Sequence, residues 1–94
     1  MNFIFEENRI YLKDSAGKTV AEVNFPDIAD GVVNIDHTFV DESLRGQGIA
    51  GQLLAAAAEK LRKENRKAYP TCSFAVKWFG SHPDYADIRV ENPD

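Results

Sequence analysis

Residues 45–51 read Arg-Gly-Gln-Gly-Ile-Ala-Gly and hold three of the six glycines of this 94-residue chain. Glycines at this density let the chain turn tightly, and they let a ligand approach the backbone closely. The stretch separates residues 32–40, which are rich in β-branched side chains, from a segment of helical periodicity that begins at Gly48. Because the first amides of a helix lack an internal acceptor, a phosphate-sized anion would fit here. A plain turn that needs positive φ is the alternative, and spacing alone does not choose between the two.

A helix is predicted from Gly48 onward, because apolar residues recur at spacings of three and four along one face. That face comprises Ala50, Leu53, Leu54, Ala57, Ala58 and Leu61. The four alanines at 55–58 favour a helix, and Asn65 is a plausible exit residue. The predicted helix therefore runs from the glycine junction to about residue 65.

Short β-type runs precede the junction. Residues 10–12 and 20–25 are predicted to form a hairpin around turn residues 15–18, with a further short strand at residues 3–5. Another turn is predicted at residues 27–31. Residues 32–40 are predicted to form one central strand that carries Val33, Ile35, His37 and Phe39 on a common face.

The segments after the helix complete the predicted fold. Residues 68–72 are expected to form a short buried strand, and residues 74–79 a second helix that Gly80 stops, with Phe74, Trp78 and Phe79 in the core. Residues 83–94 are expected to be an irregular tail with a turn or strand near Ile88. The order ββββαβα indicates an α+β fold with a mostly antiparallel sheet. Since the last strand returns through the helix, it should lie parallel to residues 32–40.

Length, composition and charge exclude several classes of protein. A chain of 94 residues and 10.5 kDa predicts a single domain over residues 1–94, with 44% apolar residues to build its core. Fifteen acidic residues against eleven Lys and Arg give a net charge of −4, which argues against nucleic-acid binding. No apolar run is long enough to span a membrane, and no Cys/His cluster implies a metal. One cysteine, Cys72, and a start unlike a signal peptide predict a cytoplasmic protein.

Positive charge gathers in the middle of the chain. Seven Lys or Arg and two Glu lie between residues 45 and 77, so this third of the chain could hold an anion. Five of these cations are Lys60, Arg62, Lys63, Arg66 and Lys67. Alternatively, these five simply complement the negative end of the helix dipole and remain solvated.

The junction also matches a known signature. Arg45-Gly46-Gln47-Gly48-Ile49-Ala50 fits, position for position, the pattern Arg/Gln-x-x-Gly-x-Gly/Ala of the Gcn5-related N-acetyltransferases, in which this loop holds the pyrophosphate of coenzyme A. The predicted order of elements resembles the core of that superfamily, which implies a parallel strand pair at an acetyl-CoA cleft. The resemblance implies acetyl-CoA as co-substrate. It implies contacts from Phe39, Val40, Arg45, Gly46, Gln47, Gly48, Ile49, Ala50 and Gly51.

More narrowly, the chain resembles a subfamily of small, single-domain acetyltransferase-like proteins. Four features carry this likeness, namely His37-Thr38, residues 45–50, Cys72 at the end of the next strand, and Tyr85-Ala86-Asp87. Members of the subfamily are described as acetyl-CoA-binding proteins of uncertain acceptor. The likeness therefore implies the ligand and leaves the acceptor open.

One departure from the larger superfamily concerns its general acid. Many members carry Asn-x-x-Ala-x-x-x-Tyr after this strand, and the Tyr protonates the leaving coenzyme A thiolate. In this chain Cys72 stands at the position of that Asn, and Phe79 stands at the position of that Tyr. A phenylalanine cannot donate a proton. The chain also ends about where the larger enzymes build an acceptor pocket, so a small acceptor, or one within this protein or a partner, is expected.

Cys72 and His37 are the candidate catalytic residues. A thiol at residue 72 could accept the acetyl group by thioester exchange, and the alternative is a buried, inert cysteine. His37 could act as a base or be hydrogen-bonded within the sheet. Thr38, Ser73 and Lys77 could reach pantetheine or phosphate, and each could equally be a cap or surface residue. His82 receives no role.

The sequence thus predicts an acetyl-CoA-binding protein that transfers the acetyl group to a small amine or thiol. Backbone amides near Val40 would polarise the thioester carbonyl. A non-catalytic acetyl-CoA binder or sensor is the alternative, so whether the chain is an enzyme stays open. The expected partners are acetyl-CoA or coenzyme A, without nucleic acid or membrane, and the expected state is a monomer or weak dimer.

Overall fold

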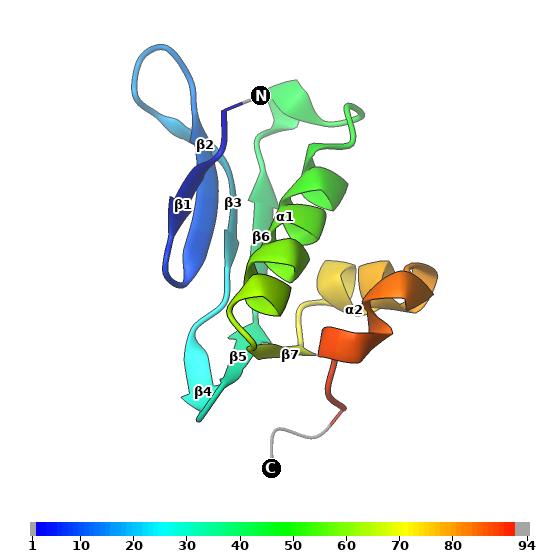
Figure 1. Ribbon diagram of the computed structural model, residues 1–94. Coiled ribbons are helices and arrows are strands. Elements are labelled where there is room, and N and C mark those ends of the chain that lie inside the picture. Colours follow the sequence, from blue (N-terminus) through cyan, green and yellow to red (C-terminus); the bar gives the residue numbers. More distant parts are fainter. Residues whose placement is uncertain (1, 92–94) are drawn as a thin grey trace.

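Two small sheets and two main helices make up the computed structural model, which describes residues 2–91 (Figure 1). In chain order the elements are β1 (Ile4–Glu6), β2 (Arg9–Lys13), β3 (Thr19–Asn24), β4 (Asp27–Ala29), β5 (Val32–Ile35), β6 (His37–Val40), η1 (Glu42–Leu44), α1 (Ile49–Lys63), β7 (Lys67–Pro70), α2 (Ser73–Ser81) and η2 (Pro83–Ile88). The predicted α+β class is confirmed.

The larger sheet is antiparallel and has the strand order β1-β2-β3-β6. The predicted hairpin is its centre, with Ile10 opposite Val23 across β2 and β3. The turn closes because one carboxylate oxygen of Asp14 accepts the backbone N–H groups of Ala16 and Lys18, both at 2.9 Å. Gly17 supplies the positive φ of 85°. In this sheet β6 is an edge strand, so one side of its backbone stays unpaired.

The smaller sheet has the order β4-β5-β7, and its β5 and β7 run parallel, with Val33 opposite Ala68. This pair confirms the predicted return of the chain through the helix. The turn predicted at residues 27–31 is wrong in its first half, because residues 27–29 form β4 and pair with β5. Only Asp30 and Gly31 make the turn.

The single strand predicted over residues 32–40 is also wrong. The segment breaks at Asp36, so β5 pairs with β7 in one sheet while β6 pairs with β3 in the other. The change of partner shifts the pleat. Val33 and Ile35 are buried, whereas His37 is exposed and Thr38 takes the inward position. The expected common face of residues 33, 35, 37 and 39 therefore does not exist.

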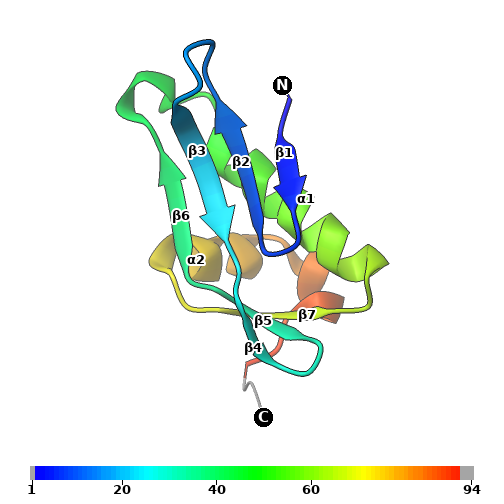
Figure 2. The ribbon, with the colours of Figure 1, turned by 90° about the vertical axis from the view of Figure 1, so that its left-hand side faces the viewer.

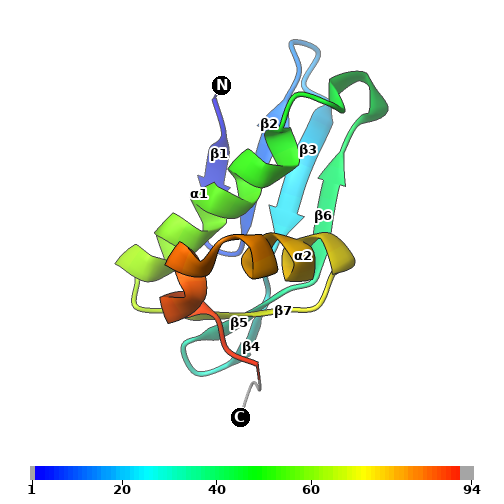
Figure 3. The ribbon, with the colours of Figure 1, turned by 90° about the vertical axis from the view of Figure 1, so that its right-hand side faces the viewer.

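Both helices lie on one face of the antiparallel sheet, which is seen from its open side in Figure 2 and from the helix side in Figure 3. The predicted helix is confirmed as α1, which buries Ile49, Leu53, Leu54, Ala57, Ala58 and Leu61. Ile49 replaces the expected Ala50 as the first fully buried position, and Ala50 is half-buried. Asn65 follows the helix with a left-handed φ of 57°, as expected of an exit residue.

The second helix extends past its predicted stop. Gly80 lies inside α2, which continues to Ser81. The terminator is Pro83, because proline disfavours helical backbone at the preceding residue, and His82 has a φ of −128° and a ψ of 73°. The predicted turn near Ile88 is the short helix η2. The end of the predicted tail, residues 92–94, lies outside the described residues.

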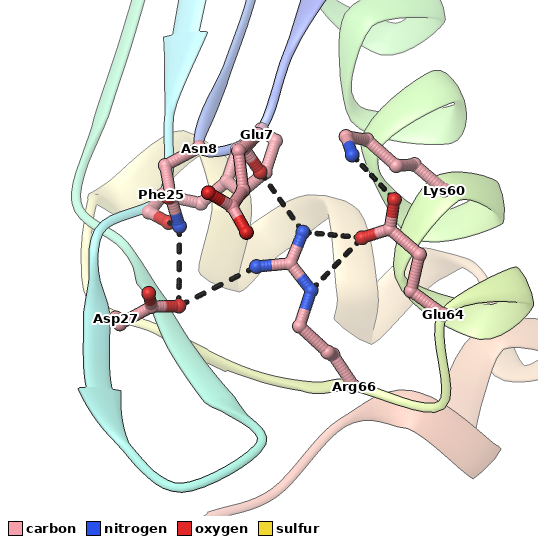
Figure 4. Close-up of polar contacts among 7 residues, drawn as sticks. All are labelled: Glu7, Asn8, Phe25, Asp27, Lys60, Glu64 and Arg66. Carbon is pink, nitrogen blue, oxygen red and sulfur yellow. Dashed lines mark hydrogen bonds and ion pairs between the residues drawn. The ribbon is translucent and has the colours of Figure 1, made fainter.

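A cluster around Arg66, just past the carboxyl end of α1, ties distant segments together (Figure 4). The Arg66 guanidinium donates to the backbone carbonyl of Glu7 at 2.9 Å and contacts the carboxylates of Glu64 and Asp27, the latter at 3.4 Å. Asn8 donates to the same Asp27 oxygen at 3.2 Å. The cluster thus joins the β1–β2 turn, β4 and the segment that follows α1.

These contacts bear on the basic middle of the chain. Arg62 pairs with Asp87 at 2.6 Å, and the Lys67 ammonium donates to the Asp87 carbonyl at 2.7 Å. A 15-residue helix is about 22 Å long, so these cations lie far from the glycine junction. Their internal pairing favours the explanation in which they serve the carboxyl end of α1.

Candidate ligand-binding site

The glycine junction begins with a capped turn. A carboxylate oxygen of Asp41 accepts the backbone N–H of Ser43 at 3.0 Å and its hydroxyl at 2.6 Å, which holds η1 in place. These hydrogen bonds lower the pKa of the Asp41 carboxyl. Gly46 and Gly48 then turn the chain with φ values of 86° and 73°. Both glycines are needed, because other residues rarely adopt this backbone conformation.

The first turn of α1 presents unpaired backbone donors. Gly48 is the N-cap and has no side chain to cap the helix, and the first helical hydrogen bond runs from Gln52 N–H to the Gly48 carbonyl at 3.1 Å. Within residues 2–91 nothing accepts from the N–H groups of Ile49, Ala50 and Gly51. Three donors at the positive end of a 15-residue helix favour an anionic oxygen ligand.

A groove of about 230 Å³ lies directly against these donors. Its lining consists of Val40, Leu44, Arg45, Gly46, Gly48, Ile49, Ala50, Gly51 and Phe74. Seven of these nine residues were predicted from the sequence, so the structure brings most of the predicted loop residues to one concave surface. Gln47 is exposed and does not line the groove.

The free edge of β6 forms the far wall of this groove. Asp41 N–H donates to the Val20 carbonyl at 2.7 Å, and Phe39 lies opposite Glu22. Because antiparallel strands alternate between inward and outward backbone groups, the N–H and carbonyl of Val40 face away from β3. The Arg45 side chain confirms this direction, since its Nε donates to the Val40 carbonyl at 3.4 Å. The Val40 N–H is thus directed to the unpaired edge.

Cys72 lies where the two sheets separate. The backbone N–H groups of Thr71 and Cys72 both donate to the Ile35 carbonyl, at 3.0 and 3.2 Å, so the chain remains beside β5. Cys72 is the N-cap of α2, and its sulfur accepts the Ala75 N–H at 3.4 Å. The Thr38 hydroxyl is also 3.4 Å from the sulfur. The half-buried thiol therefore bridges β6 and α2 across the gap.

The structure does not bring His37 to Cys72. Thr38 contacts the sulfur from the inward face of β6, and its neighbours His37 and Phe39 have side chains on the opposite face. His37 is exposed, and Phe39 is half-buried. The two candidate catalytic residues thus lie on different faces of one strand.

The remaining predicted residues lie on or near α2. Ser73 is exposed at the first position of the helix, whereas Lys77 lines a depression of about 290 Å³ on α2 together with Phe74 and Trp78. Phe79 is buried at 4% exposure and packs edge-on against Trp78, with ring centroids 5.1 Å apart.

Three contributors to the site were not predicted in the places that they occupy. Thr38 was expected to reach pantetheine or phosphate or to be a cap or surface residue, and its contact with Cys72 was not predicted. Leu44 was not considered, and Phe74 was expected in the core but is 41% exposed at the edge of the groove. Helical spacing could have separated Phe74 from its neighbours, because residues 75, 78 and 79 form the buried side of α2. The predicted face of Thr38 was wrong because the strand was predicted to be continuous. The inward direction of its side chain depends on the change of strand partner at Asp36.

Tyr85 and Asp87, which were part of the family likeness, serve the surface of α1. The Tyr85 hydroxyl donates to Glu59 at 2.8 Å, and this hydrogen bond raises the pKa of the tyrosine. The Arg62 guanidinium bonded to Asp87 lowers the pKa of that carboxyl. These residues hold η2 against α1.

The described residues, 2–91, contain neither a candidate membrane span nor a candidate metal site. None of the helices described is both long enough and apolar enough to cross a membrane. No group of three or more His, Cys, Asp or Glu in this part of the chain could hold a metal ion.

Comparison with known proteins places this architecture in a class of acyl-group transferases. The family model described as GCN5-related N-acetyl-transferase matches residues 9–88. The chain therefore belongs to the GCN5-related N-acetyltransferase family, and the resemblance inferred from the sequence is confirmed.

Individual relatives agree with this assignment. A GCN5-like protein from Staphylococcus aureus, solved by NMR, is 32% identical with a TM-score of 0.79, and the match covers 95% of this chain and 87% of that one. The family member YhbS from Escherichia coli, solved in complex with CoA, is 27% identical with a TM-score of 0.55 over 62% of this chain and 35% of that one.

Among curated proteins, Protein NATD1 of Homo sapiens is 36% identical over 52 residues, which are 55% of this chain and 46% of that protein. The matching part of this chain thus spans less than half the length of the curated relative.

Proposed function

We propose that this protein binds acetyl-CoA with the diphosphate of the ligand against the N-terminus of α1. The observation that carries the proposal is the set of three unpaired amides at Ile49, Ala50 and Gly51, which face a groove beside the free edge of β6. A diphosphate supplies the anionic acceptors that these donors lack. The CoA complex of the relative YhbS supports the same class of ligand.

The proposed path of the acyl arm follows from the direction of Val40. Its N–H is directed to the unpaired edge of β6, so it can donate to the thioester carbonyl oxygen as negative charge develops there. Cys72 lies across the gap, beside Thr38. The arm would therefore run from the α1 groove along β6 toward the point where the sheets separate.

We propose acetyl transfer to a small amine or thiol as the activity. The acceptor atom forms a bond to the carbonyl carbon, the carbon–sulfur bond of acetyl-CoA breaks, and the acceptor's proton ends on a base or on the departing coenzyme A sulfur. Cys72 is one acceptor within the protein itself, because its thiol is free and half-buried and lies at the N-terminus of α2, across the gap from β6. His37 remains the proposed base for an acceptor that approaches from the other face of β6.

A non-catalytic acetyl-CoA binder or sensor is the second proposed function. Phe79 favours it, because this buried ring stands at the position of the family's proton-donating tyrosine and cannot donate. The separation of His37 from Cys72 favours it too, since no base contacts the thiol within the described residues.

Calorimetric titration with acetyl-CoA and with coenzyme A tests the binding site, with a pair of matched variants. Gly48→Val places a side chain in the groove where the phosphates lie, and binding should be lost. Gly31→Val is the control, because Gly31 has the same φ of 73° and equally open surroundings but lies in the β4–β5 turn. Both variants carry the same backbone strain of about 1–2 kcal/mol. Full affinity in Gly48→Val would refute the assignment of the loop.

Intact-mass spectra after incubation with acetyl-CoA test Cys72 as an acceptor. The wild type should gain one acetyl group, and Cys72→Ala should gain none. An unmodified wild type would exclude a stable acetyl-enzyme. Release of free coenzyme A thiol over a panel of small amines and thiols then separates the two functions, since turnover supports the transferase and binding without release over the whole panel supports the sensor.

The proposal includes a cytoplasmic location for a one-domain protein that acts as a monomer or weak dimer. A half-buried free thiol beside the proposed thioester site suits a reducing compartment. Light scattering at several protein concentrations would give the oligomeric state.

A further inference from the structure

A second groove, of about 480 Å³, continues from the glycine junction along α1. Gly48 and Gly51 line both grooves, so the two are continuous at the first turn of the helix. The opposite wall of the second groove is aromatic and includes Trp78, His82 and Tyr85. None of these three residues has a part in the proposed function described above.

Trp78 has an unusual polar environment in this wall. The residue is only 7% exposed, and a buried indole N–H normally has a hydrogen-bond partner. Within residues 2–91 no group accepts a hydrogen bond from Trp78 Nε1. If this nitrogen were fully buried, it would be a buried donor without a partner, but among the described residues only Arg89 Nε is such an atom. Trp78 Nε1 is therefore reached by solvent, which places it at the surface of the groove.

The position of this nitrogen is next to the unpaired amides. Trp78 Nε1 lies 3.8 Å from the point that a Cβ on Gly51 would occupy. Gly51 itself contributes the third of the unpaired N–H groups of α1. Four donors without protein acceptors thus gather around one corner, three from the backbone and one from an otherwise buried side chain.

The indole is held in this orientation by its neighbours. The His82 ring stacks on it with centroids 4.1 Å apart and 17° between the planes, and Tyr85 packs at 5.2 Å. His82 Nδ1 lies 2.7 Å from the Trp78 carbonyl. Since a carbonyl only accepts, this nitrogen carries the proton and donates. The donor direction of the indole is therefore fixed before any ligand arrives.

We propose that Trp78 is a ligand-binding residue whose indole N–H donates a hydrogen bond to a phosphoryl oxygen of the ligand at the N-terminus of α1. The inference rests on the proposed binding of acetyl-CoA, and it adds a side-chain donor to a site otherwise made of backbone groups. A phosphoryl oxygen fits because it accepts several hydrogen bonds and carries the negative charge that the helix end favours. Either the diphosphate or the 3′-phosphate of coenzyme A has this chemistry.

The chain has one tryptophan, so a single indole N–H signal reports on this atom in the nitrogen–proton NMR spectrum of the wild type. Titration with coenzyme A should move that signal downfield, together with the backbone signals of residues 49–51. Dephospho-coenzyme A, which lacks the 3′-phosphate, should give the same indole shift if the acceptor is the diphosphate and none if it is the 3′-phosphate.

Trp78→Phe provides the second measurement, because it keeps an aromatic ring and removes the N–H. A hydrogen bond to a charged group predicts roughly tenfold weaker binding of coenzyme A, or more. Ile88→Val is the control for a loss of core packing, since Ile88 is 2% exposed and lines neither groove, and its affinity should stay that of the wild type. Thermal unfolding before each titration shows whether the variants are folded.

The outcomes separate the two proposals. An indole signal that stays in place while residues 49–51 shift would overturn the role of Trp78 and leave the proposed function standing, and so would wild-type affinity in folded Trp78→Phe. If neither the indole nor residues 49–51 respond to coenzyme A, the proposed function fails and the role of Trp78 fails with it.

Discussion

Gly51 lies in the first turn of α1, at the point where the two grooves meet. A methyl group there would be 3.8 Å from Trp78 Nε1, an ordinary contact distance, so the folded chain has room for it. The glycine therefore is not needed for packing within the protein. Its absence of a side chain leaves the corner between the helix amides and the indole open.

Gly51→Ala should raise the free energy of unfolding by about 0.5–1 kcal/mol, because glycine in a helix is less stable than alanine by that amount. The same change should weaken coenzyme A binding, since the methyl group projects into the open corner. Gly80→Ala is the matched control, because Gly80 also lies within a helix with open space around it but lines none of the described grooves. Urea unfolding and calorimetry measure the two effects. Equal affinity for both variants would show that the corner by Gly51 is not occupied.

At this scale the loop residues were predictable and their neighbours were not. The pattern of residues 45–51 names the backbone that surrounds the groove, because spacing and glycine content are local properties. Thr38 became the partner of Cys72 only through the shifted pleat after Asp36, which depends on strand pairing far along the chain. Trp78 was rightly predicted to be buried. The sequence does not indicate which atom of its ring is accessible from the groove.

The division of residues 32–40 into β5 and β6 is the main difference between the expected and the observed elements. Val, Ile, Thr and Phe dominate the run, and the two residues that disfavour strands, Asn34 and Asp36, are isolated within it, so propensity alone did not place the break. The break arises because β7 ends at Pro70, whereas β6 continues beside β3. The parallel pair that the connection through the helix predicts was found, since that prediction depends on the order of the elements alone.

Helix α1 was predicted well because its periodicity extends over four turns, and its exit residue followed from local chemistry. Asn65 has a φ of 57°, a conformation that asparagine tolerates better than most residues. Gly80 was misread as a stop, because an exposed glycine in a helix lowers stability without ending the helix. Pro83 is the residue that ends α2.

Asn65→Ala should lower the free energy of unfolding by about 1 kcal/mol, since alanine is strained in the left-handed conformation. Asn65→Gly should cause no loss, because glycine adopts this conformation freely. Neither change should affect coenzyme A binding, because Asn65 lies at the other end of α1. Urea unfolding of the three proteins measures the difference, and equal losses in the two variants would contradict the backbone explanation.

For the whole molecule, several surface carboxylates are bonded to cations, to backbone N–H groups or to a hydroxyl in the folded chain. Lys60 and Arg66 lower the pKa of Glu64, Arg62 lowers that of Asp87, and the Ser43 hydroxyl and N–H lower that of Asp41. Each group binds protons less readily in the folded chain than in the unfolded chain. Their contribution to stability is complete above the unfolded values of about 4 and is lost as the pH falls through the lower folded values.

The free energy of unfolding should therefore fall as the pH decreases from about 5 to 3. Urea unfolding at a series of pH values measures the slope. Glu64→Gln should be less stable than the wild type near neutral pH and less sensitive to acid, because one of the three carboxylates no longer titrates. A variant with an unchanged slope would show that the Arg66 cluster does not link folding to pH.

The location of the ligand at the N-terminus of α1 is the claim on which the proposed function rests. A crystal structure of the protein with coenzyme A tests it most directly. The diphosphate is predicted to accept hydrogen bonds from the N–H groups of Ile49, Ala50 and Gly51, with the acyl arm passing the Val40 N–H. A diphosphate bound elsewhere, for example at the basic carboxyl end of α1, or a corner filled by the protein's own side chains, would contradict the account.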